Sequence, residues 1–266
     1  MFRVGYYQFC PSFGQVGANV QRVVDALRGA DADLIVLPEL AFTGYCFRDR
    51  DELASLAEDP RNSTTIDTLT ALCHERDFYL VTGFAERHAG KCFNSALLIG
   101  PHGVLGTYRK LHLFATEKAC FDPGDLPLQV SSVRGVNVGM MICFDWIFPE
   151  VARSLTLAGA DLICHPANLV LTYCQQAMTV RCLENLVFAV TANRYGTETR
   201  PHTELSFTGQ SQIVAPRGKV LHRAPAERDD LYVAPIDVEQ ARDKHLTDRN
   251  DLLTDRRPVF YRELCE

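Results

Sequence analysis

The sequence predicts an α/β fold in which a sheet is covered by helices on both faces. Residues 33–37 (DLIVL) and 161–165 (DLICH) are short apolar strands with the continuous hydrophobicity of strands buried on both sides. Between such strands, apolar residues recur at helical spacing, as Val20, Val23 and Leu27 do. Strands that alternate with amphipathic helices are typical of α/β proteins.

The first part of the chain divides into clear strand and helix segments. Strands are expected at residues 2–9, 33–37, 79–85, 92–99 and 104–109, and helices at residues 16–27, 50–57 and 64–76. Gly29 closes the first helix, and turns at Gly90 and residues 101–103 separate the last three strands. Residues 111–125 contain Pro and Gly and have no clear period, so we expect them to form an irregular wall of a functional site.

The second part of the chain repeats this alternation. Strands are expected at residues 136–142, 161–165, 187–193 and 231–236, helices at residues 149–157 and 175–186, and a hairpin of residues 206–214 and 220–224. Pro149 suits a first helical position and ends the strand before it. Asp237 is expected to cap a short helix that runs to about residue 246.

A short internal repeat indicates two related halves. Residues 30–39 (ADADLIVLPE) and 159–168 (GADLICHPAN) both run through an acidic turn and an apolar strand to a Pro followed by a polar residue. The repeat would bring Glu39 and Asn168 to equivalent places on one edge. No linker divides the chain, so we expect a single domain over residues 1–266, with residues 248–266 as a tail that extends into solvent or contacts a second subunit.

Composition excludes several classes of function. The formal net charge of −6 provides no basic field to hold a nucleic acid. No stretch approaches the roughly 20 apolar residues of a membrane span, and the N-terminus does not resemble a secretion signal. We therefore expect a cytoplasmic protein whose ten cysteines are free thiols. Because no CxxC pair occurs, no metal site is expected.

Cys143 lies where an apolar strand gives way to a helix. A nucleophile at such an elbow is exposed above the sheet edge, and backbone N–H groups from Phe144 onward can face a developing oxyanion. A cysteine at a strand end is more often a small buried hydrophobic residue, so its position alone does not establish a role. Glu39 and Lys110 also end predicted strands, and ligands of open α/β sheets bind beyond such ends. The three side chains are therefore expected to converge.

These three side chains suit nucleophilic catalysis. A thiol with a pKa of about 8.5 is only a few per cent thiolate at neutral pH, so a neighbouring base or ammonium group helps to generate the nucleophile. Glu39 can accept the thiol proton, and Lys110 can stabilise the oxyanion that forms when Cys143 attacks a carbonyl or nitrile carbon.

The residues around these positions also resemble a known family. The blocks that carry the resemblance are LPE at 37–39, NSA at 94–96, YRKLHLF at 108–114, ICFDWIFPE at 142–150, RCLEN at 181–185 and DRRP at 255–258. Over nearly the whole chain the sequence resembles the carbon–nitrogen hydrolase, or nitrilase, superfamily. The resemblance implies a four-layer αββα sandwich of two similar βαββαβ-type halves and assembly into homodimers or larger homo-oligomers.

The resemblance also implies a role for each site residue and no cofactor. The implied roles are general base for Glu39, oxyanion stabiliser for Lys110, nucleophile for Cys143 and the family's second glutamate for Glu117. Side chains that flank the catalytic blocks are expected to bind the oxyanion or shape a pocket, namely Phe144, Tyr45, Phe114, Trp146, Asn168 and Tyr173. Many amidase-like members have a Leu-Arg pair where this chain has Trp146 and Ile147, which disfavours an anionic substrate there.

The expected function is cysteine-dependent hydrolysis of a non-peptide carbon–nitrogen bond. The substrate would be a small amide or N-carbamoyl compound, cleaved through a thioester with release of ammonia. A nitrilase acting through a thioimidate is the alternative, because the same residues suffice for both reactions. A catalytically silent binding protein of the same fold is a further alternative.

Overall fold

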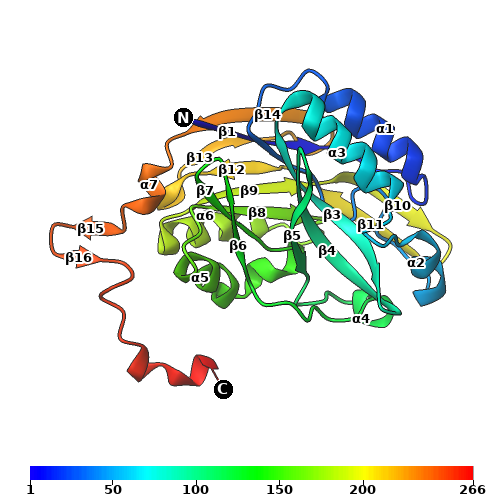
Figure 1. Ribbon diagram of the computed structural model, residues 1–266. Helices are drawn as coiled ribbons and strands as arrows, with labels where there is room; N and C mark the ends of the chain where they lie inside the picture. Colours follow the sequence, from blue (N-terminus) through cyan, green and yellow to red (C-terminus); the bar gives the residue numbers. More distant parts are fainter. Residues whose placement is uncertain (266) are drawn as a thin grey trace.

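Two six-stranded sheets face each other at the centre of the computed structural model, which describes residues 1–265 (Figure 1). In spatial order, the first sheet contains β14 (Asp230–Ile236), β1 (Phe2–Gln8), β2 (Leu34–Val36), β3 (Tyr79–His88), β4 (Lys91–Gly100) and β5 (Gly103–Arg109). The second contains β13 (Val220–Arg223), β12 (Gln212–Val214), β9 (Phe188–Asn193), β8 (Leu162–Ala167), β7 (Val136–Met140) and β6 (Val130–Val133). Separate hairpins are formed by β10 (Tyr195–Arg200) with β11 (Thr203–Thr208), and by β15 (His245–Thr247) with β16 (Asn250–Asp251).

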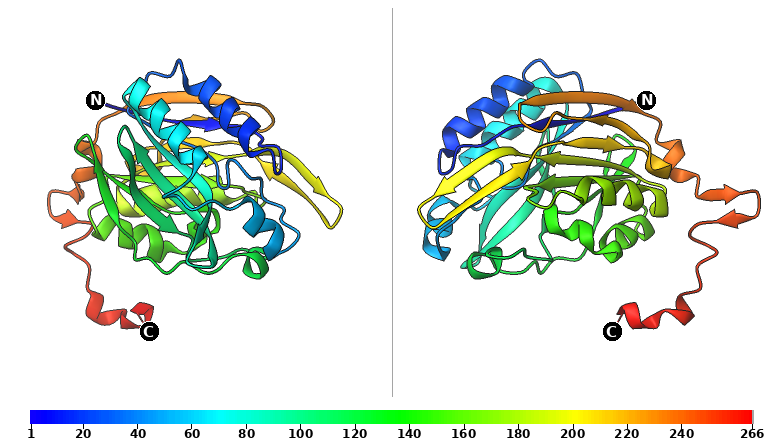
Figure 2. Two further views of the ribbon diagram at one scale, coloured as in Figure 1. Left: turned by 45° about the vertical axis from the view of Figure 1, so that its right-hand side comes forward. Right: turned by 180° about the vertical axis from the view of Figure 1, so that it is seen from behind.

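Helices cover the outer faces of both sheets. The first sheet is covered by α1 (Val16–Leu27) and α3 (Thr64–Arg76), and the second by α5 (Pro149–Leu157) and α6 (Cys174–Asn185). Shorter helices are α2 (Arg50–Leu56), α4 (Glu117–Cys120) and α7 (Glu239–Arg242). Figure 2 shows the same layers from two further sides. The architecture is the expected four-layer αββα sandwich.

Both sheets have the same topology. The three central strands, β1–β2–β3 in the first sheet and β7–β8–β9 in the second, pair in parallel. The outer pairings of both sheets are antiparallel. Helices α1 and α3 lie in the connections of the first set, and α5 and α6 in those of the second. Strands β2 and β8 are therefore equivalent, as the repeat of residues 30–39 and 159–168 predicts.

Burial on both faces explains the continuous apolar strands. Leu34 and Val36 of β2 belong to the core between the two sheets, together with Leu162 of β8. Ile35 and Leu37 point the other way and pack with the buried faces of α1 and α3. Because both faces are covered, alternation of apolar and polar residues is lost in these strands.

Helix ends follow local sequence rules. The side chain of Asp49 accepts a hydrogen bond from the backbone N–H of Glu52 (2.8 Å) at the start of α2. Ser63 does the same for Ile66 (3.1 Å) at the start of α3. Pro149 occupies the first position of α5, as expected.

The hairpin expected around residues 216–218 is present as β12 paired with β13, but the prediction of one continuous strand over residues 206–214 is wrong. The chain instead forms β11 and β12, which belong to different sheets. Between them, Gly209 and Gln210 have φ values of 57° and 56°. A Cβ on Gly209 would stand 2.1 Å from the carbonyl oxygen of Ala226. Two successive left-handed residues cannot continue a strand, so the sheet pairing breaks there.

The helix predicted from Asp237 to residue 246 is also shorter than expected. Only α7 forms, and Val238 rather than Asp237 occupies its N-cap position. Beyond the helix, Lys244 donates hydrogen bonds from Nζ to the carbonyl oxygens of Asn185 (3.0 Å) and Leu186 (2.8 Å) at the end of α6. This tertiary contact requires an extended chain where helical propensity alone would continue the turn.

The chain after α7 extends away from the sandwich (Figure 1). Apolar side chains are exposed on this tail and on the outer face of α5 and α6, namely Leu246, Val259, Phe260, Leu264, Leu157, Val180 and Leu183. Contact of residues 248–266 with a second subunit stays a prediction. Over residues 1–265, none of the helices is long and apolar enough to cross a bilayer.

Candidate active site

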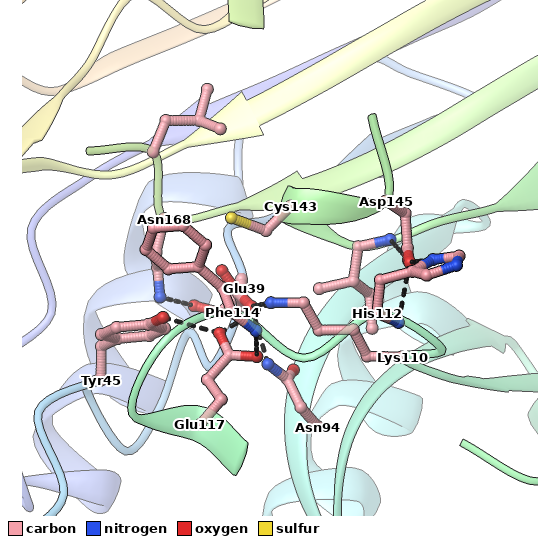
Figure 3. Close-up of polar contacts among 12 residues, drawn as sticks. Glu39, Tyr45, Asn94, Lys110, His112, Phe114, Glu117, Cys143, Asp145 and Asn168 are labelled. Carbon is pink, nitrogen blue, oxygen red and sulfur yellow. Dashed lines mark hydrogen bonds and ion pairs between the residues drawn. The ribbon is translucent and has the colours of Figure 1, made fainter. Parts of the chain in front are cut away.

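Side chains from both sheets meet beyond the ends of their strands (Figure 3). Glu39 follows β2 and Lys110 follows β5 of the first sheet, while Cys143 follows β7 of the second. The structure thus brings the three predicted side chains together, with Glu117 from the start of α4 beside them.

Lys110 lies between two carboxylates. Its Nζ donates hydrogen bonds to Oε1 of Glu39 (2.6 Å) and Oε1 of Glu117 (2.7 Å), and all three side chains are buried. Glu117 is held in turn by the hydroxyl of Tyr45 (2.6 Å) and the backbone N–H of Phe114 (3.1 Å). An ammonium group has three donors, so one N–H of Lys110 remains for a further acceptor.

Only one oxygen of the Glu39 carboxylate is occupied. Oε1 also accepts a hydrogen bond from Nδ2 of Asn94 (2.7 Å), whereas Oε2 has no hydrogen-bond partner within residues 1–265. The backbone is fixed by Gly83 of β3, since a Cβ there would stand 2.4 Å from Cα of Glu39. Oε2 is therefore available to accept a proton.

Burial and charge determine where the protons lie. Burial, assisted by the charge of Glu117, raises the pKa of Glu39. Burial alone would lower the pKa of Lys110, but the charges of Glu117 and Glu39 outweigh it and raise that pKa, so the ammonium form persists. Burial and the charge of Glu39 raise the pKa of Cys143 well above its usual value. The resting Cys143 is therefore a thiol that needs a base.

Cys143 begins a 3₁₀ helix (Cys143–Ile147) that joins β7 to α5. Its φ of 41° is in the left-handed region, which is strained for a residue other than glycine. Its carbonyl oxygen is within 2.9 Å of Nε2 of His165. The expected strand-to-helix elbow is present, with this additional turn before α5, and Phe144 supplies the first backbone N–H after the thiol.

Asp145 braces the elbow. Its Oδ2 accepts hydrogen bonds from the backbone N–H of Ile142 (2.9 Å) and the hydroxyl of Tyr108 (2.7 Å). Its Oδ1 contacts Nδ1 of His112 (2.8 Å). These bonds connect the turn that carries Cys143 to the segment around Lys110, so the distance between the two depends on a buried carboxylate. Asp145 and His112 thus have structural roles at the elbow.

A small, narrow cavity lies next to Cys143. It is lined by Phe114, Cys143, Phe144, Trp146, Asn168, Leu169, Val170 and Leu171. Nδ2 of Asn168 donates a hydrogen bond to the carbonyl oxygen of Glu39 (2.9 Å), which fixes the orientation of the amide. Its Oδ1 is buried and has no partner in the part of the chain that the structure describes.

Two of the six predicted pocket residues lie outside this lining. Phe114, Phe144, Trp146 and Asn168 line the cavity. Tyr45 instead contacts Glu117. Tyr173 is 51 % exposed and packs edge to face against Trp146, with 5.5 Å between ring centroids.

Comparison with known proteins agrees with this geometry. Residues 3–245 match the family model described as carbon-nitrogen hydrolase. The chain belongs to the carbon-nitrogen hydrolase family. It is 42 % identical to a nitrilase of Pyrococcus abyssi over 98 % of this chain and 99 % of that protein. It is 36 % identical to an (R)-stereoselective amidase of a Pseudomonas species over 95 % of this chain and 90 % of that protein.

A solved structure of the same superfamily allows the position of Cys143 to be compared with a known active-site cysteine. An amidase from Nesterenkonia sp. AN1, with acrylamide added at its active-site cysteine, has a TM-score of 0.82 and 25 % identity, covering 99 % of this chain and 100 % of that one. Cys143 occupies the position that matches the active-site cysteine of this amidase. The protein is therefore an enzyme of the carbon-nitrogen hydrolase family, with relatives of both amidase and nitrilase type.

Some members of the site were not expected from the sequence. Asn94 belongs to a block that carries the family resemblance, but its hydrogen bond to Glu39 depends on the pairing of β3, β4 and β5. Leu169, Val170 and Leu171 line the cavity directly after Asn168. The sequence feature that could have identified them is the apolar run of three residues directly after Asn168, the polar residue at the end of a strand.

His165 is a buried structural histidine that supports the backbone of Cys143. Nε2 faces the carbonyl oxygen of Cys143 (2.9 Å), and Nδ1 faces the hydroxyl of Thr191 (3.1 Å). A neutral ring satisfies both contacts by donating from Nε2 and accepting at Nδ1. Burial lowers the pKa of His165 to about 4.

This histidine is expected to make stability depend on pH. The unfolded chain binds a proton at His165 below a pH of about 6.5, whereas the folded chain does so only below about 4. The neutral ring therefore contributes fully to the free energy of unfolding above pH 6.5. This contribution, about 3 kcal/mol, is lost as pH falls from about 6.5 to about 4. Urea denaturation at pH 7 and 4.5 would measure it. His165→Gln should show a shallower dependence, and an equal loss in both proteins would contradict the assignment.

Proposed function

We propose that the enzyme hydrolyses a small amide or N-carbamoyl compound to release ammonia through a thioester on Cys143. Support comes from the buried cluster in which Lys110 bridges Glu39 and Glu117 beside the thiol. The cluster contains a base with a free oxygen, a cation with a free N–H and a nucleophile. These are the three groups that acyl transfer requires.

The first step forms the carbon–sulfur bond. Oε2 of Glu39 accepts the thiol proton as Sγ of Cys143 attacks the carbonyl carbon. The carbonyl oxygen becomes an oxyanion, stabilised by the remaining N–H of Lys110 and the backbone N–H of Phe144. Glu117 keeps Lys110 in place during this change, because it is hydrogen-bonded to the same ammonium group.

The second step breaks the carbon–nitrogen bond. Glu39 returns the proton to the departing nitrogen, ammonia leaves and a thioester remains on Cys143. Water then attacks the thioester and gives a proton to Glu39. Expulsion of the thiolate, which takes that proton back, releases the acid and restores the thiol.

One observation favours an amide or carbamoyl group over a nitrile. Asn168 lines the cavity, and its buried Oδ1 has no hydrogen-bond partner among the described residues. An amide or carbamoyl nitrogen carries N–H donors that can satisfy it, and a nitrile nitrogen carries none. A buried acceptor left unpaired costs about 1 to 3 kcal/mol. The apolar lining formed by Phe114, Trp146 and Leu169 further supports a short, uncharged acyl group.

A nitrile is the second candidate substrate. The 42 % identity to the Pyrococcus abyssi nitrilase favours it. Attack of Cys143 on a nitrile carbon would give a thioimidate, and Glu39 and Lys110 would take the same parts as in amide hydrolysis.

Ammonia release from matched substrates tests the proposal. Short apolar amides, N-carbamoyl amines and nitriles of equal chain length would be compared by kcat/KM. We expect amides or carbamoyl compounds to be preferred, and we expect Asn168→Ala to lower their kcat/KM by about tenfold, the equivalent of about 1.4 kcal/mol. A higher kcat/KM for nitriles would contradict the proposal and support nitrile hydrolysis, the second candidate. Release of no ammonia from any substrate would refute both.

A further inference from the structure

A buried ion pair lies outside the groups that carry the chemistry. Arg194 directly follows β9, and Glu198 belongs to β10 of the hairpin that is separate from both large sheets. Nη1 of Arg194 donates to Oε2 of Glu198, and the two side chains are 1 % and 6 % exposed. Burying two charges is costly unless further hydrogen bonds satisfy them. The remaining contacts of Glu198 therefore indicate what the pair is for.

Glu198 binds the loop that carries Tyr45. Its Oε1 accepts hydrogen bonds from the backbone N–H groups of Tyr45 (3.1 Å) and Cys46 (2.6 Å). The preceding residue, Gly44, has a φ of 81°, and a Cβ there would stand 3.1 Å from Oε2 of Glu198 and 2.9 Å from Phe13. A side chain at position 44 would therefore collide with Phe13 and crowd the carboxylate, and the positive φ also favours glycine there.

The same structure holds the ring of Tyr45. Phe207 of β11 packs edge to face against this ring, with 5.8 Å between centroids. The ring of Phe207 also contacts the guanidinium of Arg194, whose central carbon lies 4.2 Å from the ring centroid. Backbone and ring of Tyr45 are therefore both fixed by the hairpin and its buried ion pair.

Tyr45 connects this assembly to the reacting groups. Its hydroxyl donates to Oε1 of Glu117 (2.6 Å), the same oxygen that accepts a hydrogen bond from Lys110 (2.7 Å). The other oxygen of Glu117 is held by the backbone of Phe114. The orientation of Glu117, and through it the direction of the Lys110 ammonium, depends on where Tyr45 stands.

We propose that Glu198, supported by Arg194, is a positioning residue for hydrolysis: it fixes Tyr45 so that the tyrosine hydroxyl keeps Glu117 oriented on Lys110. The inference rests on the proposed function, because it assigns a role within that reaction. Displacing a group by about 1 Å can cost a large factor in rate even when the substituted residue is far from the substrate.

The alternative is that the pair only anchors the hairpin. A matched control exists for this alternative, because the same hairpin is tied to the body by a second ion pair between Arg200 and Glu52. Glu52 lies in the first turn of α2. Within the described residues, none of its hydrogen bonds involves Tyr45. Glu52→Gln weakens the attachment of the hairpin and leaves the direct contacts among Glu198, Tyr45 and Glu117 in place.

A double-mutant cycle separates the two roles. For a short amide, we expect Glu198→Ala and Tyr45→Phe each to lower kcat about tenfold with KM within twofold. The double variant should be no more than twofold below the slower single variant, since both changes break one path. Glu198→Gln, which keeps an acceptor for the two N–H groups, should restore most of kcat. Glu52→Gln should keep the kcat of the wild type.

Additive losses in the double variant, an unchanged kcat in Glu198→Ala, or an equal loss in Glu52→Gln would overturn the proposal. Melting temperatures identify variants that fail to fold. If Glu198→Ala does so, Glu198→Asp takes its place, because the shorter side chain keeps the charge beside Arg194 and withdraws from the loop. If the wild type releases no ammonia, the proposed function fails separately. The cycle is then measured as the rate of Cys143 alkylation by iodoacetamide, with the same fold-changes expected and the same outcomes against it.

Discussion

Replacing Cys143 by Ala is expected to lower kcat by about 10⁵- to 10⁶-fold, as loss of the nucleophile does in other covalent hydrolases. Without the sulfur no thioester can form, although Glu39, Lys110 and Glu117 keep their mutual hydrogen bonds. The variant should therefore fold and melt like the wild type. Single-turnover ammonia release at high enzyme concentration would measure the residual rate.

The control for this substitution is another buried cysteine. Cys73 lies on α3, on the outer face of the first sheet, and Cys73→Ala should retain kcat. Mass spectrometry of the wild type after brief exposure to substrate should find the acyl group on the peptide that contains Cys143. A Cys143→Ala variant that keeps more than a small fraction of kcat, or an acyl group on a different cysteine, would contradict the assignment.

Replacing Lys110 by Ala is expected to lower kcat by at least about 10²- to 10³-fold, the usual cost of one oxyanion donor. A second effect adds to this loss. Without the ammonium group the carboxylates of Glu39 and Glu117 are left buried beside each other, which raises the pKa of Glu39 further. A protonated Glu39 cannot accept the thiol proton, so the deficit should grow as pH falls.

Profiles of kcat/KM against pH would resolve the two effects. In the wild type, activity should be lost as pH falls through the pKa of Glu39, which burial raises above its usual value. The Lys110 ammonium persists to high pH because its own pKa is raised. Lys118→Ala, which removes the exposed cation next to Glu117, should leave the profile unchanged. A Lys110→Ala profile parallel to that of the wild type, with only a small drop in rate, would argue against both effects.

The sequence predicts the elements that are covered on both faces. The apolar runs around Ile35 and Ile163 identify β2 and β8, because a strand between two packed layers needs hydrophobic side chains on each side. Once these strands are placed, Glu39 and Asn168 must lie at their ends. The position of Cys143 follows in the same way from β7.

Contacts between distant polar residues could not be predicted in this way. Arg194 and Glu198 are of residue types that are rarely buried, and no element was expected at residues 194–200. Their burial depends on the backbone of Tyr45, which is 153 residues away from Glu198. Asn94 presents the same problem, because its partner Glu39 is 55 residues away. No local pattern encodes such a pair.

The false strand at residues 206–214 has a different cause. Gly209 interrupts an otherwise strand-like run, and an isolated glycine in a strand indicates a bulge or a close backbone approach. The signal was therefore present. What it could not show is that β11 and β12 would join different sheets on either side of this glycine.

The division of the site between two sheets makes turnover depend on the spacing of the layers. Glu39 and Lys110 move with the first sheet, and Cys143 with the second. Side chains such as Val36 and Leu162, which fill the space between the sheets, act as spacers that set the gap between base and nucleophile. A substitution that changes the volume of a spacer can thus alter the catalytic rate without touching the cavity. Substitutions between the two sheets can therefore change the catalytic rate of this enzyme while the residues that contact the substrate stay the same.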